Sequence, residues 1–298
     1  MQKMIDLTKQ ELLTRIEKLY NALNSKSEKW NAAFIVDKIN QYYFTGTMQD
    51  GVFVLHGDGA DVSNAYIETE IMPVAMLERL CKHVKIENLL PLDRAISCVM
   101  AVKSVYEISC MAESGRQHKH LLEVVAPTLL RMLPEMQGQL NEAEFTSVLY
   151  EKMVKQGYHG VSRFGMFQTE CVIGQIAFGE NSLRPTNFDG PGGMKGLCPA
   201  VPIIGDRRRL LKKGDLVFVD IGYGFDGYHT DRTQIYMYDA KPSDEVMQVH
   251  QRCMKVQNEV AAMLKPGAIP AEIYKKITAV GFVNRNVKLF GARRRSAN

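Results

Sequence analysis

The stretch Leu216-Val217-Phe218-Val219-Asp220-Ile221-Gly222-Tyr223-Gly224-Phe225-Asp226-Gly227-Tyr228-His229-Thr230-Asp231 decides the fold, because it predicts a β-hairpin that carries two acidic residues. The apolar run 216–221 is rich in β-branched and aromatic residues and is typical of a buried strand. Residues 228–236 alternate in the manner of a second strand. Asp226-Gly227 between them is a strong hairpin-turn signal.

Two registers of this hairpin are open. A four-residue loop centred on Phe225-Asp226 places Asp220 directly opposite Asp231, whereas a two-residue Asp226-Gly227 turn places Asp220 opposite Thr233 and makes Asp231 its diagonal neighbour. Both put the two carboxylates on one face of the hairpin, about 4.5–8 Å apart. Like charges this close destabilise a sheet, and a divalent cation removes the penalty because hard ions prefer carboxylate oxygens.

We therefore predict a metal site at Asp220 and Asp231. The alternative is a pair splayed into water at the end of the hairpin. The apolar run before Asp220 disfavours that alternative, since ionisable groups in apolar settings are usually functional.

Length and composition bound the class of protein. The chain has 298 residues, 46% of them hydrophobic, which suffices for two domains with separate cores. No run of 18 apolar residues occurs, so we expect no transmembrane helix and no membrane partner. The start of the chain turns polar at once, and the six cysteines are scattered, which predicts reduced, mostly buried thiols in a cytoplasmic protein. Three of the net +4 charges lie in Arg293–Arg295, so no nucleic-acid partner is expected.

The spacing of apolar residues divides the chain into two predicted domains. Strands and helices alternate in the first hundred residues, which predicts an α/β domain at 1–101. Its expected elements are helices at 7–24 and 75–83 and strands at 32–36, 51–55 and 65–68. The second domain, 102–298, is expected to hold helices at 104–120, 126–136, 141–156, 243–264 and 270–278, and strands at 171–178 and in the hairpin.

Two helix starts in the second domain carry capping signals. Ser104 and Glu107 form a predicted capping box, and Asn141 is a predicted N-cap. A Gly/Pro-rich loop follows at 179–193, and such loops lie on the surface and often carry binding groups.

Several of these motifs together resemble the M24 metallopeptidases, a family with the pita-bread fold that includes methionine aminopeptidase, aminopeptidase P and proline dipeptidase. The residues that carry the resemblance are Gly214-Asp215, Asp220, Gly227-Tyr228, Asp231-Arg232-Thr233 and Lys265-Pro266-Gly267. Lys103-Ser104 with Glu107-Ile108 resembles the first helix of the catalytic domain in the proline-specific branch, and residues 15–55 resemble its creatinase-like N-terminal domain. The resemblance implies an α/β chain in which a creatinase-like domain precedes an incomplete pita-bread domain.

The resemblance also implies a metal centre and a reaction. Family members bind two divalent ions, often Mn or Co, through five side chains, of which Asp220 and Asp231 match two. The other three, a histidine in a Gly-His-Gly-x-Gly-Leu motif and two later glutamates, have no match here. The implied parent activity removes the N-terminal residue from short peptides, and in the proline-specific branch proline lies next to the cleaved bond. This chain is expected to be inactive and to retain at most a weak partial metal site.

Two alternatives to the peptidase interpretation stay open. The first is a non-catalytic pita-bread protein that acts as a binding or dimerisation module, and a homodimer is open in either case. The second is a metal-free hydrolase of the creatinase type. The surviving pair of aspartates argues against a long non-catalytic history, which disfavours the first alternative. It also disfavours the second, because a metal-free hydrolase would not need a carboxylate pair.

Three stretches depart from the family pattern. The chain ends Ala292-Arg293-Arg294-Arg295-Ser296-Ala297-Asn298, which in a shifted reading frame can encode His-Gly-Val-Gly-Leu-Gln; we hypothesise an out-of-frame version of the ligand motif. The stretch 57–68 connects one strand directly to the next, where the family usually has another strand and helix. The N-terminal domain is therefore expected to be internally shortened. Thr186 and Asn187 follow Pro185 where the family usually has a histidine, which argues against ordinary Xaa-Pro specificity.

Other polar candidates receive plainer interpretations. His229 shares a strand face with Asp231 and could reach substrate, although a hydrogen-bonded bystander is favoured. His118 and His120 are two residues apart on a helix, where rings do not share a face, and are interpreted as solvated. Arg207–Arg209 is interpreted as a charged loop, and Gly190–Gly193 lacks the Gly-Lys-Ser/Thr ending of a phosphate loop.

Overall fold

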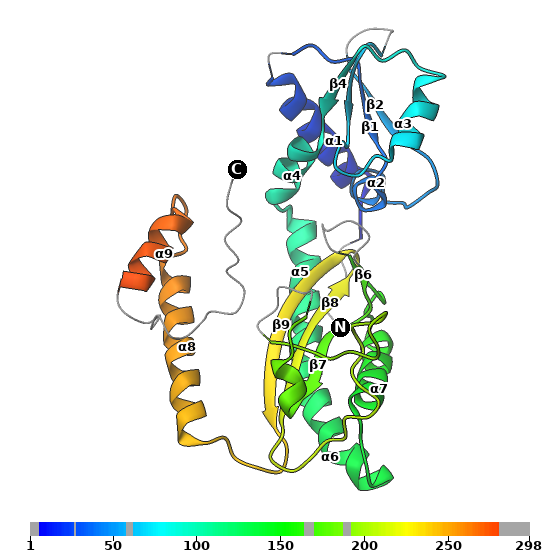
Figure 1. The fold of residues 1–298 in the computed structure, drawn as a ribbon. Helices are drawn as coiled ribbons and strands as arrows, with labels where there is room; N and C mark the ends of the chain where they lie inside the picture. The colour runs from blue at the N-terminus through cyan, green and yellow to red at the C-terminus, as the bar shows by residue number, and fades with distance from the viewer. Residues whose placement is uncertain (1–5, 27, 58–61, 164–169, 187–191, 280–298) are drawn as a thin grey trace. The chain divides into compact units, whose positions relative to one another are not determined.

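The computed structural model describes residues 6–26, 28–57, 62–163, 170–186 and 192–279 (Figure 1). The chain is mixed α/β, as predicted, and forms two compact units that divide between Ala112 and Glu113. This division falls within helix α5 (Val105–His120). The expected domain limits, 1–101 and 102–298, stay a prediction. The chain's C-terminal end and the Asp58-Gly59 turn lie outside the described residues, and so do Asn187 and Gly190-Pro191.

The N-terminal unit is built on a four-stranded sheet of order β2-β1-β3-β4. Its elements are α1 (Lys9–Asn24), β1 (Ala32–Ile35), α2 (Lys38–Thr45), β2 (Phe53–His56), β3 (Asn64–Ile67), α3 (Val74–Cys81), β4 (Asn88–Pro91) and α4 (Asp93–Ala101). β1, β3 and β4 are parallel, and β2 is antiparallel to β1. Side chains of α1, α2 and α4 form one core with the sheet, and α3 packs on a second cluster around Phe34 and Ile67.

Sequence patterns missed three elements of this unit: α2, β4 and α4. Helix α2 is short, but its ends are well defined, since Asp37 accepts a hydrogen bond from the Asn40 amide at 2.9 Å and Gly46 ends it at φ 73°. β4 contains Pro91, which argues against a strand by pattern. The structure places β4 at the edge of the sheet, where a proline is tolerated.

The C-terminal unit has a three-stranded antiparallel sheet of order β7-β8-β9. Its elements are α5, a π-helical turn η1 (Leu121–Val125), α6 (Ala126–Gln137), α7 (Glu142–Lys155), β5 (Ser162–Arg163), β6 (Glu170–Cys171), β7 (Gly174–Phe178), a 3₁₀ turn η2 (Gly179–Leu183), β8 (Leu216–Phe225), β9 (Tyr228–Met237), α8 (Asp244–Met263) and α9 (Pro270–Ala279). Both predicted caps are confirmed. Ser104 and Glu107 exchange hydrogen bonds of 2.8 and 3.2 Å, and Asn141 forms a capping box with Glu144.

The core of this unit determines which way β8 presents its side chains. Val217, Val219, Ile221 and Tyr223 are buried against apolar residues of η1, α6 and α7. Because side chains alternate along a strand, the residues between them, including Asp220, point to the opposite face. The hairpin therefore keeps its acidic face away from the helices.

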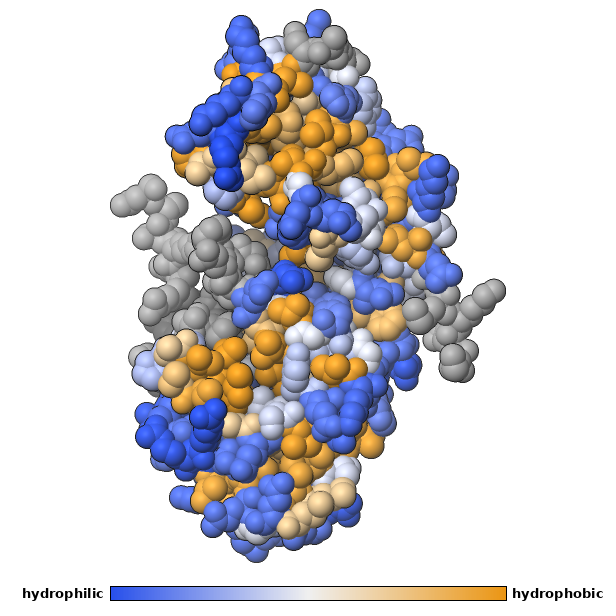
Figure 2. All heavy atoms as spheres, turned by 90° about the vertical axis from the view of Figure 1, so that its right-hand side faces the viewer, coloured by the Kyte–Doolittle hydropathy of each residue, from blue (hydrophilic) through white to orange (hydrophobic). Residues whose placement is uncertain are grey.

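The surface corrects one expectation. All six cysteines are free thiols, but four of them are exposed and only Cys110 and Cys171 are buried, so the expectation of mostly buried cysteines is wrong. Exposed apolar side chains also occur, such as Val74 and Leu183, and Figure 2 shows apolar surface interspersed with hydrophilic side chains on one side of the molecule. Among the described helices, none alone has the length and apolar character to cross a membrane; α4 and Val105–Gln137 pass only as a pair bent by 75°.

Candidate metal centre

The hairpin turn settles the register. Asp226 and Gly227 both have positive φ, 47° and 84°, which fits the two-residue primed turns that suit the twist of a hairpin. Asp220 lies opposite Thr233, and Asp231 lies opposite Gly222. The two-residue alternative is thus confirmed. The carboxylates share one face as diagonal neighbours, about 7–8 Å apart by the usual strand geometry.

The two carboxylates have unequal surroundings. Asp220 is half-buried and accepts a hydrogen bond from the Thr233 hydroxyl at 2.5 Å, whereas Asp231 is exposed. Burial raises the pKa of the Asp220 carboxyl, the Thr233 hydrogen bond lowers it, and the nearby Asp231 charge adds a smaller increase. Both burial and repulsion make ionised Asp220 costly, and a bound cation would offset both.

A third polar group, which the sequence pattern did not predict, lies beside the pair. Gln175 of β7 lies directly opposite Asp220, and its side chain is 4% exposed. Its amide nitrogen donates to the Thr186 hydroxyl at 3.3 Å, while the Oε1 atom, within the described residues, has no hydrogen-bond partner. A polar residue inside the otherwise apolar strand Gly174–Phe178 was the available signal.

The donor set fits one hard divalent cation better than two. Carboxylate and amide oxygens are the ligands that Mg²⁺, Ca²⁺ and Mn²⁺ prefer. Across the described part of the chain, no cluster of three or more His, Cys, Asp or Glu side chains is placed to hold a metal ion. Two carboxylates and a neighbouring amide leave most of the coordination sphere to water, which fits weak binding.

His229 lies on the same face as Asp231 but is held by other partners. Its Nε2 atom lies 2.9 Å from Nε2 of His159, and the ring centroids are 4.7 Å apart. Burial lowers the pKa of His229, and burial followed by the His229 contact lowers the pKa of His159 to about 4. This paired arrangement is the one expected of a bystander, and a role toward substrate stays a prediction.

The interpretation of His118 as a solvated residue is wrong. His118 is 1% exposed, and its Nδ1 atom lies 3.1 Å from the Thr230 hydroxyl, the neighbour of Asp231. Ser114, one helical turn earlier, also contacts Thr230, at 3.1 Å. Burial and the Arg232 charge lower the pKa of His118 to about 4. Helix α5 therefore contacts β9 at Thr230, next to Asp231. His120 is exposed, as predicted.

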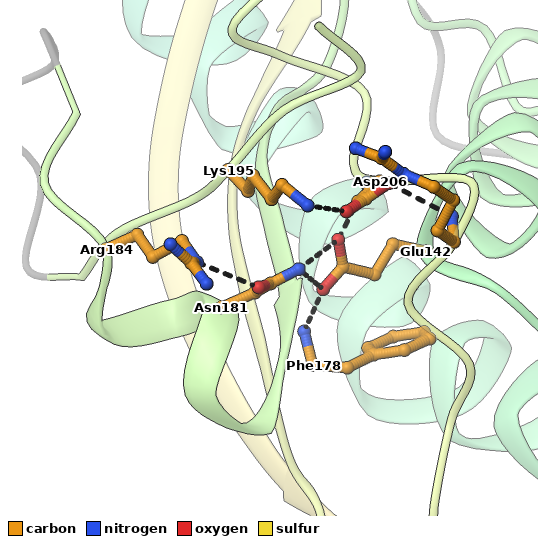
Figure 3. Close-up of polar contacts among 7 residues, drawn as sticks. Glu142, Phe178, Asn181, Arg184, Lys195 and Asp206 are labelled. Carbon is orange, nitrogen blue, oxygen red and sulfur yellow. Dashed lines mark hydrogen bonds and ion pairs between the residues drawn. The ribbon is translucent and has the colours of Figure 1, made fainter.

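A buried carboxylate, Glu142, anchors the loop that follows β7 (Figure 3). Glu142 is 0% exposed and accepts hydrogen bonds from the Phe178 and Asp206 backbone amides, both at 2.7 Å, and from the Asn181 side chain at 3.1 and 3.2 Å. Burial raises its pKa, and these hydrogen bonds lower it. Gly205 has φ 90°, and a Cβ there would lie 2.6 Å from the Glu142 Cβ, so the approach requires glycine.

The anchored loop borders the acidic face of the sheet. A Cβ on Gly192 would lie 2.5 Å from the Phe218 ring, and Phe218 shares its strand face with Asp220. Thr186 of the same loop contacts Gln175. The Lys195–Asp206 ion pair, at 2.5 Å, secures the far end of the loop (Figure 3). These contacts place the described part of the loop beside the acidic face.

Comparisons with known proteins agree with this architecture. The model of "Metallopeptidase family M24" matches residues 109–284. The prolidase from Pyrococcus horikoshii OT3 is similar over 90% of this chain and 78% of its own, with TM-score 0.64 and 17% identity. The X-Pro aminopeptidase from Thermotoga maritima MSB8 is similar over 82% and 72%, with TM-score 0.57 and 16% identity.

A third similar structure is the N-terminal domain of FACT complex subunit SPT16 from Cicer arietinum, over 93% of this chain and 77% of its own, with TM-score 0.64 and 12% identity. At these identities the structures show the shared fold alone. A sequence comparison with curated proteins found no significant match.

Proposed function

Because the chain belongs to metallopeptidase family M24, we propose that Asp220 and Asp231 are the hairpin's contribution to a peptidase metal centre. The observation that carries this proposal is their shared face, with Asp220 half-buried and oriented by Thr233. A divalent cation held there would polarise a scissile carbonyl and lower the pKa of water. Manganese and cobalt suit the oxygen ligands of such a centre.

The chain's own residues have separate tasks in this proposal. Thr233 orients the Asp220 carboxylate through its hydroxyl hydrogen, as partners of metal ligands commonly do. Ser114 and His118 hold Thr230 and so fix the position of Asp231. The loop anchored by Glu142 would limit the access of water to the acidic face. The substrates would be short peptides, cleaved at their N-terminal peptide bond.

We further propose that residues 1–298 by themselves do not hydrolyse peptides. The described residues supply two of the five ligands that the family resemblance implies, and two carboxylates cannot enforce a dinuclear geometry. The six free cysteines suit a reducing compartment, and we propose the cytoplasm.

Hydrolysis of Xaa-Pro dipeptides tests this proposal. Purified residues 1–298, supplied with Mn²⁺ or Co²⁺, are expected to release no more product than the same protein with a chelator. Metal-dependent turnover that disappears in an Asp220→Asn variant would contradict the inactive assignment. If the gene continues in the shifted frame near codon 292, the extended chain is expected to be active.

One observation favours the alternative of a non-catalytic module. The fold is shared with a FACT complex subunit, and a fold by itself does not specify a reaction. Failure of the extended chain to hydrolyse any short peptide would favour this module over the peptidase.

A further inference from the structure

A buried glutamine lies beside the half-buried aspartate of the acidic face. Gln175 of β7 and Asp220 of β8 are direct partners across an antiparallel pair, so their side chains share one face of the sheet. Directly opposite residues have Cβ atoms about 4.5–5.5 Å apart, whereas diagonal neighbours lie about 7–8 Å apart. The Cβ atom of Gln175 is therefore closer to Asp220 than that of Asp231 is.

The amide group of Gln175 is only half satisfied. Its Nε2 atom donates to the Thr186 hydroxyl at 3.3 Å, while Oε1 is buried and accepts no hydrogen bond from a described residue. A buried acceptor without a donor is destabilising, and folded proteins contain few of them. We therefore expect Oε1 to interact with a group that the polypeptide itself does not supply.

The Asp220 carboxylate also has an oxygen to spare. Thr233, on the strand at the other side of Asp220, donates its hydroxyl hydrogen to Oδ1. The second oxygen, Oδ2, accepts no hydrogen bond from a described residue. Two oxygen acceptors without donors on one face of a sheet attract a cation, and carboxylate and amide oxygens are the usual ligands of hard divalent ions.

A neutral third ligand suits this face better than a further carboxylate. Among the described residues, no third His, Cys, Asp or Glu is placed to complete a metal site with Asp220 and Asp231. The two carboxylates already repel each other, and an amide oxygen adds a ligand without adding charge. Gln175 is also 4% exposed, so on this side an ion would meet protein oxygen in place of water.

We propose that Gln175 Oε1 is a third, neutral ligand of the cation held by Asp220 and Asp231, so that β7, β8 and β9 each contribute one ligand. Thr186 is the positioning residue, because it holds the amide nitrogen and leaves Oε1 to the ion. This inference rests on the proposed metal centre and adds a residue to it.

Substitutions of Gln175 test the proposal through Mn²⁺ binding followed by electron paramagnetic resonance. Gln175→Leu is expected to weaken binding about tenfold, because it removes one ligand. Gln175→Glu is expected to tighten binding about tenfold, because it keeps the oxygen and adds a negative charge. Gln234→Leu is the control: Gln234 lies opposite Val219, on the other face of the same sheet, and its replacement is expected to leave binding unchanged.

Urea unfolding without metal distinguishes a ligand from a structural residue. Gln175→Leu is expected to unfold at the same or a higher urea concentration than the unmodified protein, because it removes an unsatisfied oxygen. A lower midpoint would indicate a structural role and overturn the proposal. Weaker binding by Gln175→Glu would also overturn it, since it would place the amide nitrogen at the ion.

The aspartate variants separate this inference from the metal centre itself. If Asp220→Asn abolishes Mn²⁺ binding while Gln175→Leu binds like the unmodified protein, the role of Gln175 is wrong and the metal centre stands. If the unmodified protein binds no Mn²⁺ at millimolar concentration, both the metal centre and the role of Gln175 are overturned.

Discussion

Replacing Glu142 with leucine is expected to lower the free energy of unfolding of the C-terminal unit by about 3–5 kcal/mol. The substitution keeps the side-chain volume but leaves the Phe178 and Asp206 amides, and the Asn181 side chain, without their shared acceptor. Leaving a buried donor unsatisfied costs more than an average hydrogen bond contributes, and three donors lose their acceptor here. Urea unfolding followed by circular dichroism measures the change.

The unfolding of the C-terminal unit, which contains Glu142, needs a probe within that unit. The single tryptophan, Trp30, is buried in the N-terminal unit, so its fluorescence does not follow Glu142. Hydrogen exchange of the segments 142–155 and 174–183 provides the local readout, and both are expected to exchange faster in the variant.

Two further substitutions define the contribution of the carboxylate. Glu142→Gln is expected to cost about 1–3 kcal/mol, because one oxygen still accepts while the amide nitrogen opposes the Asp206 N–H. Glu151→Leu, at an exposed position on the same helix, is the control and is expected to change stability by about 0.5 kcal/mol or less. A Glu142→Leu variant as stable as this control would show that the cluster does not anchor the loop.

Acidification is expected to destabilise the C-terminal unit by about 3 kcal/mol between pH 6.5 and pH 4 because of His118. Burial lowers its pKa from 6.5 to about 4, so the folded imidazole stays neutral in this window while the unfolded one takes up a proton. The stabilisation is therefore complete above pH 6.5 and disappears as the pH falls through 4. Urea unfolding at a series of pH values measures this slope.

Variants at two histidines isolate the effect. His118→Gln is expected to be less stable at neutral pH and to have a flatter pH dependence, because it cannot titrate. His120→Gln, two residues later at an exposed position, is expected to retain the slope of the unmodified protein. Equal slopes in both variants would show that another group causes acid sensitivity.

The hairpin and its acidic face could be predicted because both depend on local sequence, namely the turn residues and the alternation of side chains along each strand. Asp226-Gly227 tolerates the positive φ that the turn requires, and the alternation of the two strands fixes which side chains share a face. The choice between the two registers needed the structure, since both agree with the sequence pattern.

The buried polar groups could not be predicted from the spacing of apolar residues, because that pattern assigns every polar side chain to the solvent-exposed face. Cys110, Ser114, Gln117, His118 and Leu121 share one helical face, and all are buried. His118 lies three residues before the apolar Leu121, so the two side chains share a helical face. This spacing was the signal that could have placed His118 in the core. The hydrogen-bond partners of Glu142 are far away in the sequence, so no local pattern reveals it. Gln175 had a local signal, as the polar residue of an otherwise apolar strand, but its position opposite Asp220 needed the structure.

Binding of Mn²⁺ followed by electron paramagnetic resonance tests the central claim most directly. The protein is expected to bind about one ion with a dissociation constant on the order of 10⁻⁴–10⁻³ M, a range typical of weak oxygen-ligand sites. Asp220→Asn and Asp231→Asn are each expected to abolish this binding. Asp239→Asn removes the same charge at an exposed position paired with Lys213, and is expected to leave it intact. Binding that survives in both site variants would contradict a metal site at this pair of aspartates.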